Sequence, residues 1–314
     1  MKQRKFFLLF VFLIAFSAFA VGQPPEQKQK VRTVTIPISI FTKKELKEKQ
    51  IEEYVQADRI VVKEDKDEQQ ILSIRSVDIS PLSIALVIQE DLTTNFNLQL
   101  GDIKDFIREL PKGTRVMVAY ARSGTIEVRQ RFTDDLKKAS NSLRIVSGSS
   151  AFGPRSPYYA VSEVVGRFEG VPAGRRALLL FSDGLDATSG MNLASIAQSF
   201  DLNQAISKSQ HKGVAVYSFY SPTAPTENGN SIFALAALGA LDKLSDETGG
   251  RSFSNGTIAP ISYTPFFKDM VLSLNRQFSL TYLSTHMKKG YHKVEVMSTN
   301  PEVKIEHPKG YYYR

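Results

Sequence analysis

The sequence of 314 residues contains no cysteine at all. This absence excludes thiol catalysis, zinc sites with cysteine ligands, thiol redox exchange and lipid attachment through cysteine. Small exported domains often depend on disulfides, but a chain of this length can bury enough apolar surface to fold without them. The sequence therefore predicts a domain that is stabilised by its hydrophobic core.

Histidine is scarce, with four residues in the whole chain, and the common catalytic motifs are missing. No two histidines stand four positions apart with a glutamate between them, as the zinc-protease helix requires. The sequence also lacks a Gly-x-Ser-x-Gly nucleophile elbow, a phosphate-binding loop and a dinucleotide-binding glycine fingerprint. We therefore expect no catalytic residues and no enzyme activity. A hydrolase that uses Asp91 or Asp183 is a remote alternative.

Long apolar runs are confined to the N-terminus. Three cationic residues among the first five precede an apolar run from Phe6 to Phe16, and small residues follow at Ala18–Ala20. This order is typical of a secretory signal peptide over residues 1–20, because the run is too short to cross about 30 Å of hydrocarbon. An uncleaved anchor is the alternative. No later run is long enough to span a bilayer, so we expect an exported protein, periplasmic or secreted.

The net charge of +8 comes from charges that are scattered along the chain. A nucleic-acid interface would need a basic patch or stripe, whereas scattered charges of both signs indicate an ordinary solvated surface. We therefore expect no nucleic-acid partner.

The first part of the chain is predicted to be rich in β-structure. Residues 21–30 are polar and contain proline, as in a flexible leader. Residues 31–80 form the predicted β-rich preamble, which consists of an alternating strand over 31–40, a charged helix over 43–57 and a hairpin over 59–77.

From residue 81 the pattern changes to apolar strands that alternate with helices. Ile84–Ile88 and Ala177–Phe181 are continuous apolar runs of strand length, which is typical of strands buried on both faces. The alternation predicts an α/β fold over 81–275, with a doubly wound, mostly parallel sheet. Two alternating strands over 276–314 predict a C-terminal β-hairpin that extends this domain.

Five sequence elements occur in a distinctive order. They are VMVAYA (116–121), ALLLFSDGLD (177–186), DETGGRSF (246–253), RQFSLTY (276–282) and KGYY (309–312). In this order they resemble a von Willebrand factor type A (vWA) domain, and more closely the VWFA-related exported family described from Acidobacteria. The resemblance covers about residues 31–314. It implies an exported domain that binds another macromolecule and catalyses nothing.

The resemblance also implies a metal-ion-dependent adhesion site at the carboxyl ends of the parallel strands. In vWA domains an Asp-x-Ser-x-Ser loop, a hydroxyl from a second loop and a distal Asp hold the cation. Here Gln89 replaces the leading Asp, Asp91 and Thr93 replace the two Ser, and Ser156 and Asp183 match the other two positions. Hard cations need anionic oxygen ligands, so we expect a degenerate site with weak Mg²⁺ or Ca²⁺ binding or no metal.

Two alternatives remain for these loops. A second register starts at Asp91 and continues through Thr93 and Asn95, but it moves the loop two residues beyond the strand end. We prefer the register that starts at Gln89 because the apolar run ends there. A purely structural interpretation also fits, in which Asp183 belongs to the turn after a strand and Asp91 caps the next helix.

Four further residues near these loops are predicted to contact a partner. Glu90 and Asn95 follow the first strand, while Tyr158 and Tyr159 begin a helix, and tyrosine is enriched in interface cores. The predicted partner surface comprises the loops 89–95, 149–157 and 183–192. We therefore expect an exported vWA-like protein-binding module. The alternative is a structural or envelope-assembly protein without metal, whose preamble and tail make the contacts.

Overall fold

The computed structural model describes eight ranges of the chain: 30–42, 60–76, 81–122, 124–148, 156–172, 175–188, 199–227 and 231–313. The chain divides into two compact units, Met1–Val31 and Arg32–Arg314, and every helix and strand named below lies in the second. The predicted signal peptide and the predicted helix over 43–57 lie outside the described residues. None of the helices that the structure describes is long and apolar enough to cross a membrane.

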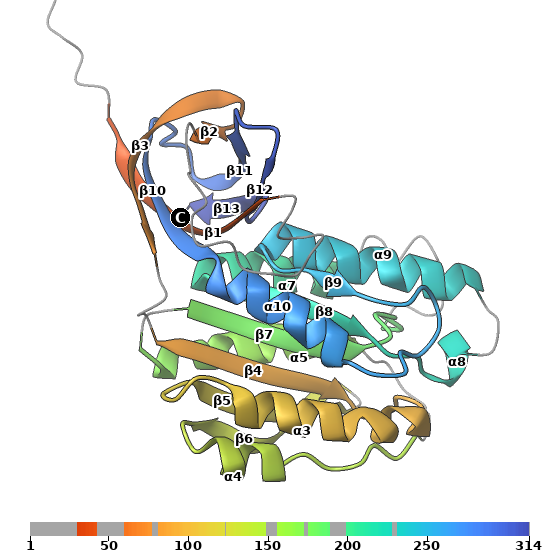
Figure 1. The fold of residues 1–314 in the computed structure, drawn as a ribbon. Coiled ribbons are helices and arrows are strands. Elements are labelled where there is room, and N and C mark those ends of the chain that lie inside the picture. Colours follow the sequence, from red (N-terminus) through yellow and green to blue (C-terminus); the bar gives the residue numbers. More distant parts are fainter. Residues whose placement is uncertain are drawn as a thin grey trace, which may run out of the picture. The chain divides into compact units, whose positions relative to one another are not determined.

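A six-stranded sheet forms the centre of the α/β part (Figure 1). Its strands are β4 (Leu82–Gln89), β5 (Arg115–Arg122), β6 (Thr125–Thr133), β7 (Arg175–Ser182), β8 (Ala215–Tyr220) and β9 (Ser252–Phe253). The order is β6-β5-β4-β7-β8-β9, and neighbours run parallel except for the antiparallel edge strand β6. The predicted α/β fold is confirmed, with a mixed sheet. Because β5 and β7 flank β4 on opposite sides, the winding direction changes between β4 and β7, where such sheets place their ligand sites.

Helices cover both faces of this sheet. One face carries α3 (Leu100–Glu109), α4 (Leu136–Asn141) and α10 (Thr264–Asn275), and the other carries α5 (Pro157–Gly166), α7 (Phe200–Lys212) and α9 (Ser231–Thr248). Shorter helices are η2 (Thr94–Gln99), η3 (Arg167–Gly170) and α8 (Ala224–Glu227). Ile84, Leu86 and Ile88 of β4 join the first core, and Ala85 and Val87 join the second. Ile84–Ile88 of β4 are therefore buried on both faces, as their continuous apolar run predicted.

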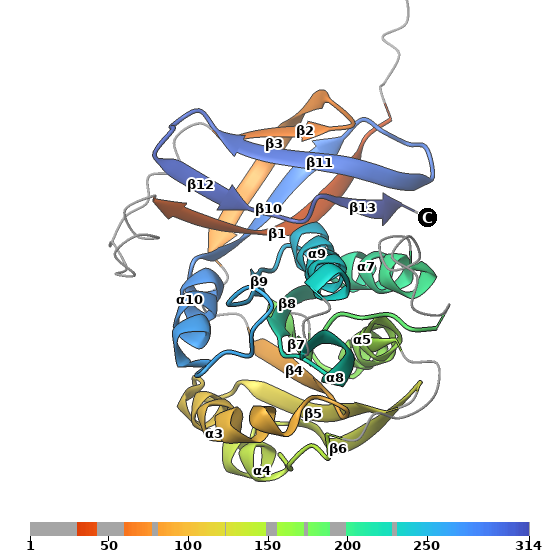
Figure 2. The same cartoon turned by 90° about the vertical axis from the view of Figure 1, so that its right-hand side faces the viewer.

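A second, antiparallel sheet combines strands from both ends of the chain and curls strongly (Figure 2). Its strands are β1 (Arg32–Thr42), β2 (Ile60–Glu64), β3 (Asp67–Ser76), β10 (Gln277–Ser284), β11 (Gly290–Ser298), β12 (Val303–Glu306) and β13 (Gly310–Tyr313). Alternate side chains of these strands, such as Val34, Ile36 and Ile38 of β1, form a third hydrophobic core.

The predicted C-terminal hairpin is wrong. The sheet order is β12-β1-β10-β3-β2-β11-β13, so β10 pairs with β1 and β3, while β11 pairs with β2 and β13. The β2–β3 hairpin therefore lies between the two tail strands, which do not pair with each other. Alternating hydrophobicity indicates a strand and its buried face, but it does not identify the neighbouring strand.

Candidate functional site

The carboxyl ends of β4 and β7 are joined by two side chains. Ile88 pairs with Phe181, so Gln89 and Ser182 end neighbouring strands. Ser182 donates its hydroxyl hydrogen to Gln89 Oε1 over 2.5 Å, and both side chains are buried. Ser182 Oγ also accepts a hydrogen bond from the amide of Gly184 at 2.9 Å. The sequence pattern pointed to Gln89 but missed Ser182, whose side chain faces the same edge.

Asp183 follows directly and is fully buried. Its Oδ1 accepts a hydrogen bond from the amide of Leu185 at 3.0 Å, and its Oδ2 accepts one from the hydroxyl of Thr223. Thr223 comes from the loop after β8, which sequence reasoning did not consider. The sequence feature that could have identified Thr223 is the Ser-Pro-Thr turn directly after a buried strand. Gly184 shapes the turn with φ +76°, where a Cβ would lie 2.6 Å from the carbonyl oxygen of Ala237.

Ser156 reaches a different carboxylate from the one we expected. It caps the N-terminus of α5, and its hydroxyl donates to Asp186 Oδ2 over 3.4 Å. The same Oδ2 accepts a hydrogen bond from Ser199, while Asp186 Oδ1 accepts from the amide and the hydroxyl of Thr188 at 2.9 and 2.6 Å. Asp186 and Ser199 were both missed. Asp186 could have been identified from the sequence, because it is the second aspartate of SDGLD at the end of a strand.

The loop after β4 lies against the loop after β8. The amide of Thr93 donates to the carbonyl of Pro222 over 3.0 Å, and Leu92 forms an isolated bridge with Thr223. Asp91 is buried in the same loop. The structure therefore brings the predicted residues to one edge of the sheet, and Gln89 is the last residue of β4.

Three buried atoms at this edge lack a hydrogen-bond partner among the described residues, namely Gln89 Nε2, Glu90 Oε2 and Thr93 Oγ1. The amide nitrogen can only donate, so it offers nothing to a cation and repels one. The carboxylates of Asp183 and Asp186 accept hydrogen bonds from the protein's own donors. These residues do not fit a strong site for Mg²⁺ or Ca²⁺, which needs several anionic oxygens facing one point. They do fit a hydrogen-bonded network.

Tyr158 is a core residue, which corrects its prediction as a partner contact. Its side chain is fully buried, and its hydroxyl donates to the carbonyl of Gly184 over 2.6 Å. Burial, together with the nearby carboxylates of Asp183 and Asp186, raises the pKa of Tyr158 well above its ordinary value. The phenol therefore stays protonated and supports the turn after β7. Tyr159, in contrast, is exposed and available for contact.

The other two predicted contact residues have partners within the chain. Glu90 pairs with Arg144 at 2.9 Å, and Arg144 also bonds Glu127 at 3.0 Å. Glu90 is therefore part of an ion-pair network beside the loop. Asn95 is exposed, and its Nδ2 donates to Glu227 of α8 over 3.4 Å.

Large exposed apolar side chains occur in the segments that leave this edge of the sheet, towards which the arrows of β4, β7 and β8 point in Figure 1. Some lie in η2, which follows β4, and others lie near the start of α5, α7 or α9. The remaining ones lie in the segment between β9 and α10. Together they are Leu98, Tyr159, Phe200, Ile232, Leu235, Ile258 and Ile261. Apart from Tyr159, sequence reasoning missed them, because a single apolar residue in a helix carries no signal of exposure.

A scan against family models gives no match, and a search of curated proteins gives none. Among solved structures, a von Willebrand factor type A protein from Catenulispora acidiphila is 10% identical, covers 92% of this chain and 74% of its own, and has a TM-score of 0.44. The conserved hypothetical protein BatB from Bacteroides thetaiotaomicron is 13% identical, covers 62% of this chain and 98% of its own, and has a TM-score of 0.42. At such identities and TM-scores, the likeness concerns the arrangement of helices and strands alone.

Proposed function

We propose that this protein is an exported, non-catalytic, vWA-like module that binds another protein. Its contact surface would be the edge formed by the carboxyl ends of the parallel strands. The adhesion site at this edge would be degenerate, with a hydrogen-bonded network in place of a tightly held cation. Export is inferred from the cationic and apolar N-terminus.

The observation that carries the proposal is the set of exposed apolar side chains around this edge. Leu98 in η2, Phe200 at the start of α7 and Ile261 after β9 are 80%, 77% and 93% exposed. Water contact with so many large apolar groups is unfavourable, and such groups often mark protein-binding surfaces. Covering them with a partner would remove this apolar area from water and stabilise the complex.

The network beneath these side chains supports a rigid binding surface without catalysis. Each link joins two chain segments: Gln89 to Ser182, Asp183 to Thr223, and Ser156 to Asp186. A surface held in one conformation loses less entropy on binding. The hydroxyls of Ser156, Ser182 and Thr223 are buried and bonded within the protein, which supports a role in positioning.

Site-specific photo-crosslinking in the native envelope tests the proposal. A photoreactive residue replaces Leu98 or Phe200 at the strand-end edge, and Leu72, exposed on β3 of the curled sheet, is the matched control. We expect one protein to be captured from Leu98 and from Phe200 but not from Leu72, equally with and without chelator.

Two outcomes would overturn the proposal. Capture from Leu72 alone would favour the structural or assembly role, with contacts made by the curled sheet. Absence of adducts at all three positions would remove the strand-end edge as a binding surface.

A further inference from the structure

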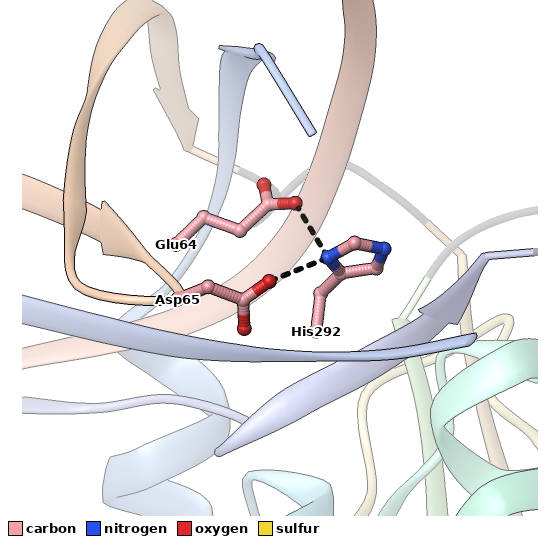
Figure 3. A group of neighbouring side chains, drawn as sticks. All are labelled: Glu64, Asp65 and His292. Atoms are coloured by element: carbon pink, nitrogen blue, oxygen red, sulfur yellow. Dashed lines mark hydrogen bonds and ion pairs between the residues drawn. The ribbon is translucent and has the colours of Figure 1, made fainter. Parts of the chain in front are cut away.

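A second polar cluster lies in the curled sheet, away from the strand ends described above. Glu64 ends β2, Asp65 follows in the turn to β3, and His292 lies in β11 (Figure 3). One ligand-type atom from each of these residues lies within 4.8 Å of the others. The pairing of Val294 with Glu64 fixes β11 against β2, so the backbone holds the three side chains together.

His292 points one ring nitrogen into the cluster and holds the other outside it. Its Nε2 lies 2.7 Å from the carbonyl oxygen of Lys288, which only accepts, so Nε2 carries the hydrogen. Its Nδ1 lies 2.7 Å from Asp65 Oδ2 and 3.3 Å from Glu64 Oε1. In a neutral imidazole this nitrogen would carry a lone pair that faces two carboxylate oxygens and is repelled by them. Such an arrangement is stable only with a cation between them, either a proton or a metal ion.

His286 has the same orientation. Its Nε2 lies 3.1 Å from Asp67 Oδ2, and its Nδ1 lies 3.9 Å from Glu64 Oε1. Nδ1 is buried and meets no hydrogen-bond partner in the described part of the chain. Metal-binding histidines commonly donate their outer N–H to a carboxylate or a backbone carbonyl, which orients the inner nitrogen. His292 and the neighbouring His286 both have that arrangement, although His286 lies outside the group of three whose ligand atoms are within 4.8 Å of one another.

The two carboxylate oxygens of Glu64 differ in the number of hydrogen bonds that they accept. Oε1 accepts hydrogen bonds from Tyr311 at 2.8 Å, from Ser284 at 2.9 Å and from Arg32 at 3.3 Å. Oε2 is buried and has no hydrogen-bond partner among the described residues, although the side chain is 0% exposed. An unpartnered carboxylate oxygen in a buried position is strongly unfavourable. A cation bound at Oε2 would remove this penalty.

We propose that Glu64, Asp65, His286 and His292 bind a divalent transition-metal ion such as Zn²⁺. Imidazole nitrogen and carboxylate oxygen are suitable ligands for Zn²⁺, whereas Mg²⁺ and Ca²⁺ prefer oxygen alone. Metal–ligand distances of about 2.1 Å place neighbouring ligands of a tetrahedron about 3.4 Å apart. The two Nδ1 atoms lie 3.3 and 3.9 Å from Glu64 Oε1, which shares its carboxyl carbon with Oε2. His292 Nδ1 and Asp65 Oδ2 are only 2.7 Å apart, so these two ligands would have to separate when the ion binds.

Glu64, Asp65 and His292 already have ligand atoms within 4.8 Å of one another, and His286 would have to move towards them to become the fourth ligand. A tetrahedral site with four protein ligands would leave no position for a substrate, so we assign the ion a structural role. It would tie the β2–β3 turn to β11 and to the segment between β10 and β11. These elements come from opposite ends of the chain, and their strands are neighbours in the curled sheet. Bound metal would therefore stabilise this sheet against unfolding.

Calorimetric titration of the chelator-treated protein with ZnCl₂ at neutral pH tests the site. We expect one Zn²⁺ per chain and at least ten-fold weaker binding in His286→Gln and in His292→Asn. His211→Gln is the matched control, because His211 lies in α7 and stacks on Tyr312. Asp183→Asn is the control for the strand-end edge, and both controls should bind Zn²⁺ like the parent.

Absence of Zn²⁺ binding by the parent would overturn the proposal. Unchanged affinity in His286→Gln would also overturn it, as would loss of binding in Asp183→Asn. His286 is 23% exposed, so its replacement is compatible with folding even if His292→Asn does not fold. None of these outcomes depends on whether the strand-end edge binds a partner.

Discussion

Gln89 Oε1 lies 2.5 Å from Ser182 Oγ, so a hydrogen bond joins the ends of β4 and β7 at the point where the sheet changes its winding direction. In a vWA adhesion site the position of Gln89 would carry an aspartate. The amide retains the acceptor that Ser182 needs but removes the negative charge that a hard cation needs.

An aspartate in place of Gln89 would supply this negative charge and should make the stability of the protein respond to Mg²⁺. We expect the melting temperature of the parent to stay unchanged on addition of Mg²⁺ or Ca²⁺, and that of Gln89→Asp to rise with Mg²⁺. The measurement is thermal unfolding with and without the ion, with Gln89→Asn as the uncharged control. A rise in the parent that disappears in Asp183→Ala would instead indicate a working metal site.

Replacement of Gly184 should be strongly destabilising. Its φ of +76° disfavours any side chain, and a new Cβ would lie 2.6 Å from both Ala237 O and Leu241 Cγ. We expect Gly184→Ala to lower the free energy of unfolding by at least about 2 kcal/mol in urea titrations. The matched control is Gly213→Ala, where φ is +60° but no atom lies within 4 Å, and the expected loss is about 1 kcal/mol. Equal losses would contradict the close approach to α9.

Thr223 should stabilise the fold through its bond to Asp183. Thr223→Val keeps the shape of the side chain but leaves one oxygen of a fully buried carboxylate without this donor. We expect a loss of about 1–3 kcal/mol in the free energy of unfolding. Thr125→Val removes an exposed hydroxyl that donates to the carbonyl of Arg122, and it should change stability by less than about 0.5 kcal/mol. A similar small effect for both variants would show that the strand-end network contributes little.

The burial of His307 leads to a prediction of how the stability of the curled sheet changes with pH. Burial lowers the pKa of His307 below its ordinary value of 6.5, and its Nε2 accepts a hydrogen bond from the amide of Val296 at 3.2 Å. The folded state therefore favours the neutral ring, whereas the unfolded chain takes up a proton near pH 6.5. We expect stability to fall as the pH drops below 6.5, by up to about 1.4 kcal/mol per pH unit, until the lowered pKa is reached.

The measurement for His307 is urea unfolding at pH 7 and at pH 5, for the parent and for His307→Gln. Glutamine does not titrate, so the loss of stability between the two pH values should be smaller in the variant. The idea fails if parent and variant lose the same free energy over this range.

Much of the sheet edge was predictable from the sequence, because the apolar runs of β4 and β7 end where the strands end. This placed Gln89 and Asp183 at the same edge of a parallel sheet. The contacts made by Thr223 and Ser199 were not predictable, since they depend on how the loops after β8 and before α7 approach the turn after β7. Loop conformation is set by packing rather than by a repeating pattern.

The curled sheet was less predictable than the α/β sheet. Alternation correctly indicated β10 and β11, but their pairing with β1, β3, β2 and β13 depends on long-range contacts. For the same reason the cluster of Glu64, Asp65 and His292 had no sequence signal, because 227 residues separate Asp65 from His292. Ligands that are far apart in sequence form a readable pattern only when a resemblance to a known site supplies it, and none did so for this cluster.

The central claim is that the exposed apolar side chains at the strand ends hold a protein partner without a metal ion. The test is the affinity of the crosslinked partner for the parent and for the triple variant Leu98→Ser, Phe200→Ser, Ile232→Ser, each measured with and without chelator. We expect at least a ten-fold loss of affinity in the triple variant and no effect of chelator on the parent. Unchanged affinity in the triple variant, or loss of binding in chelator, would contradict it.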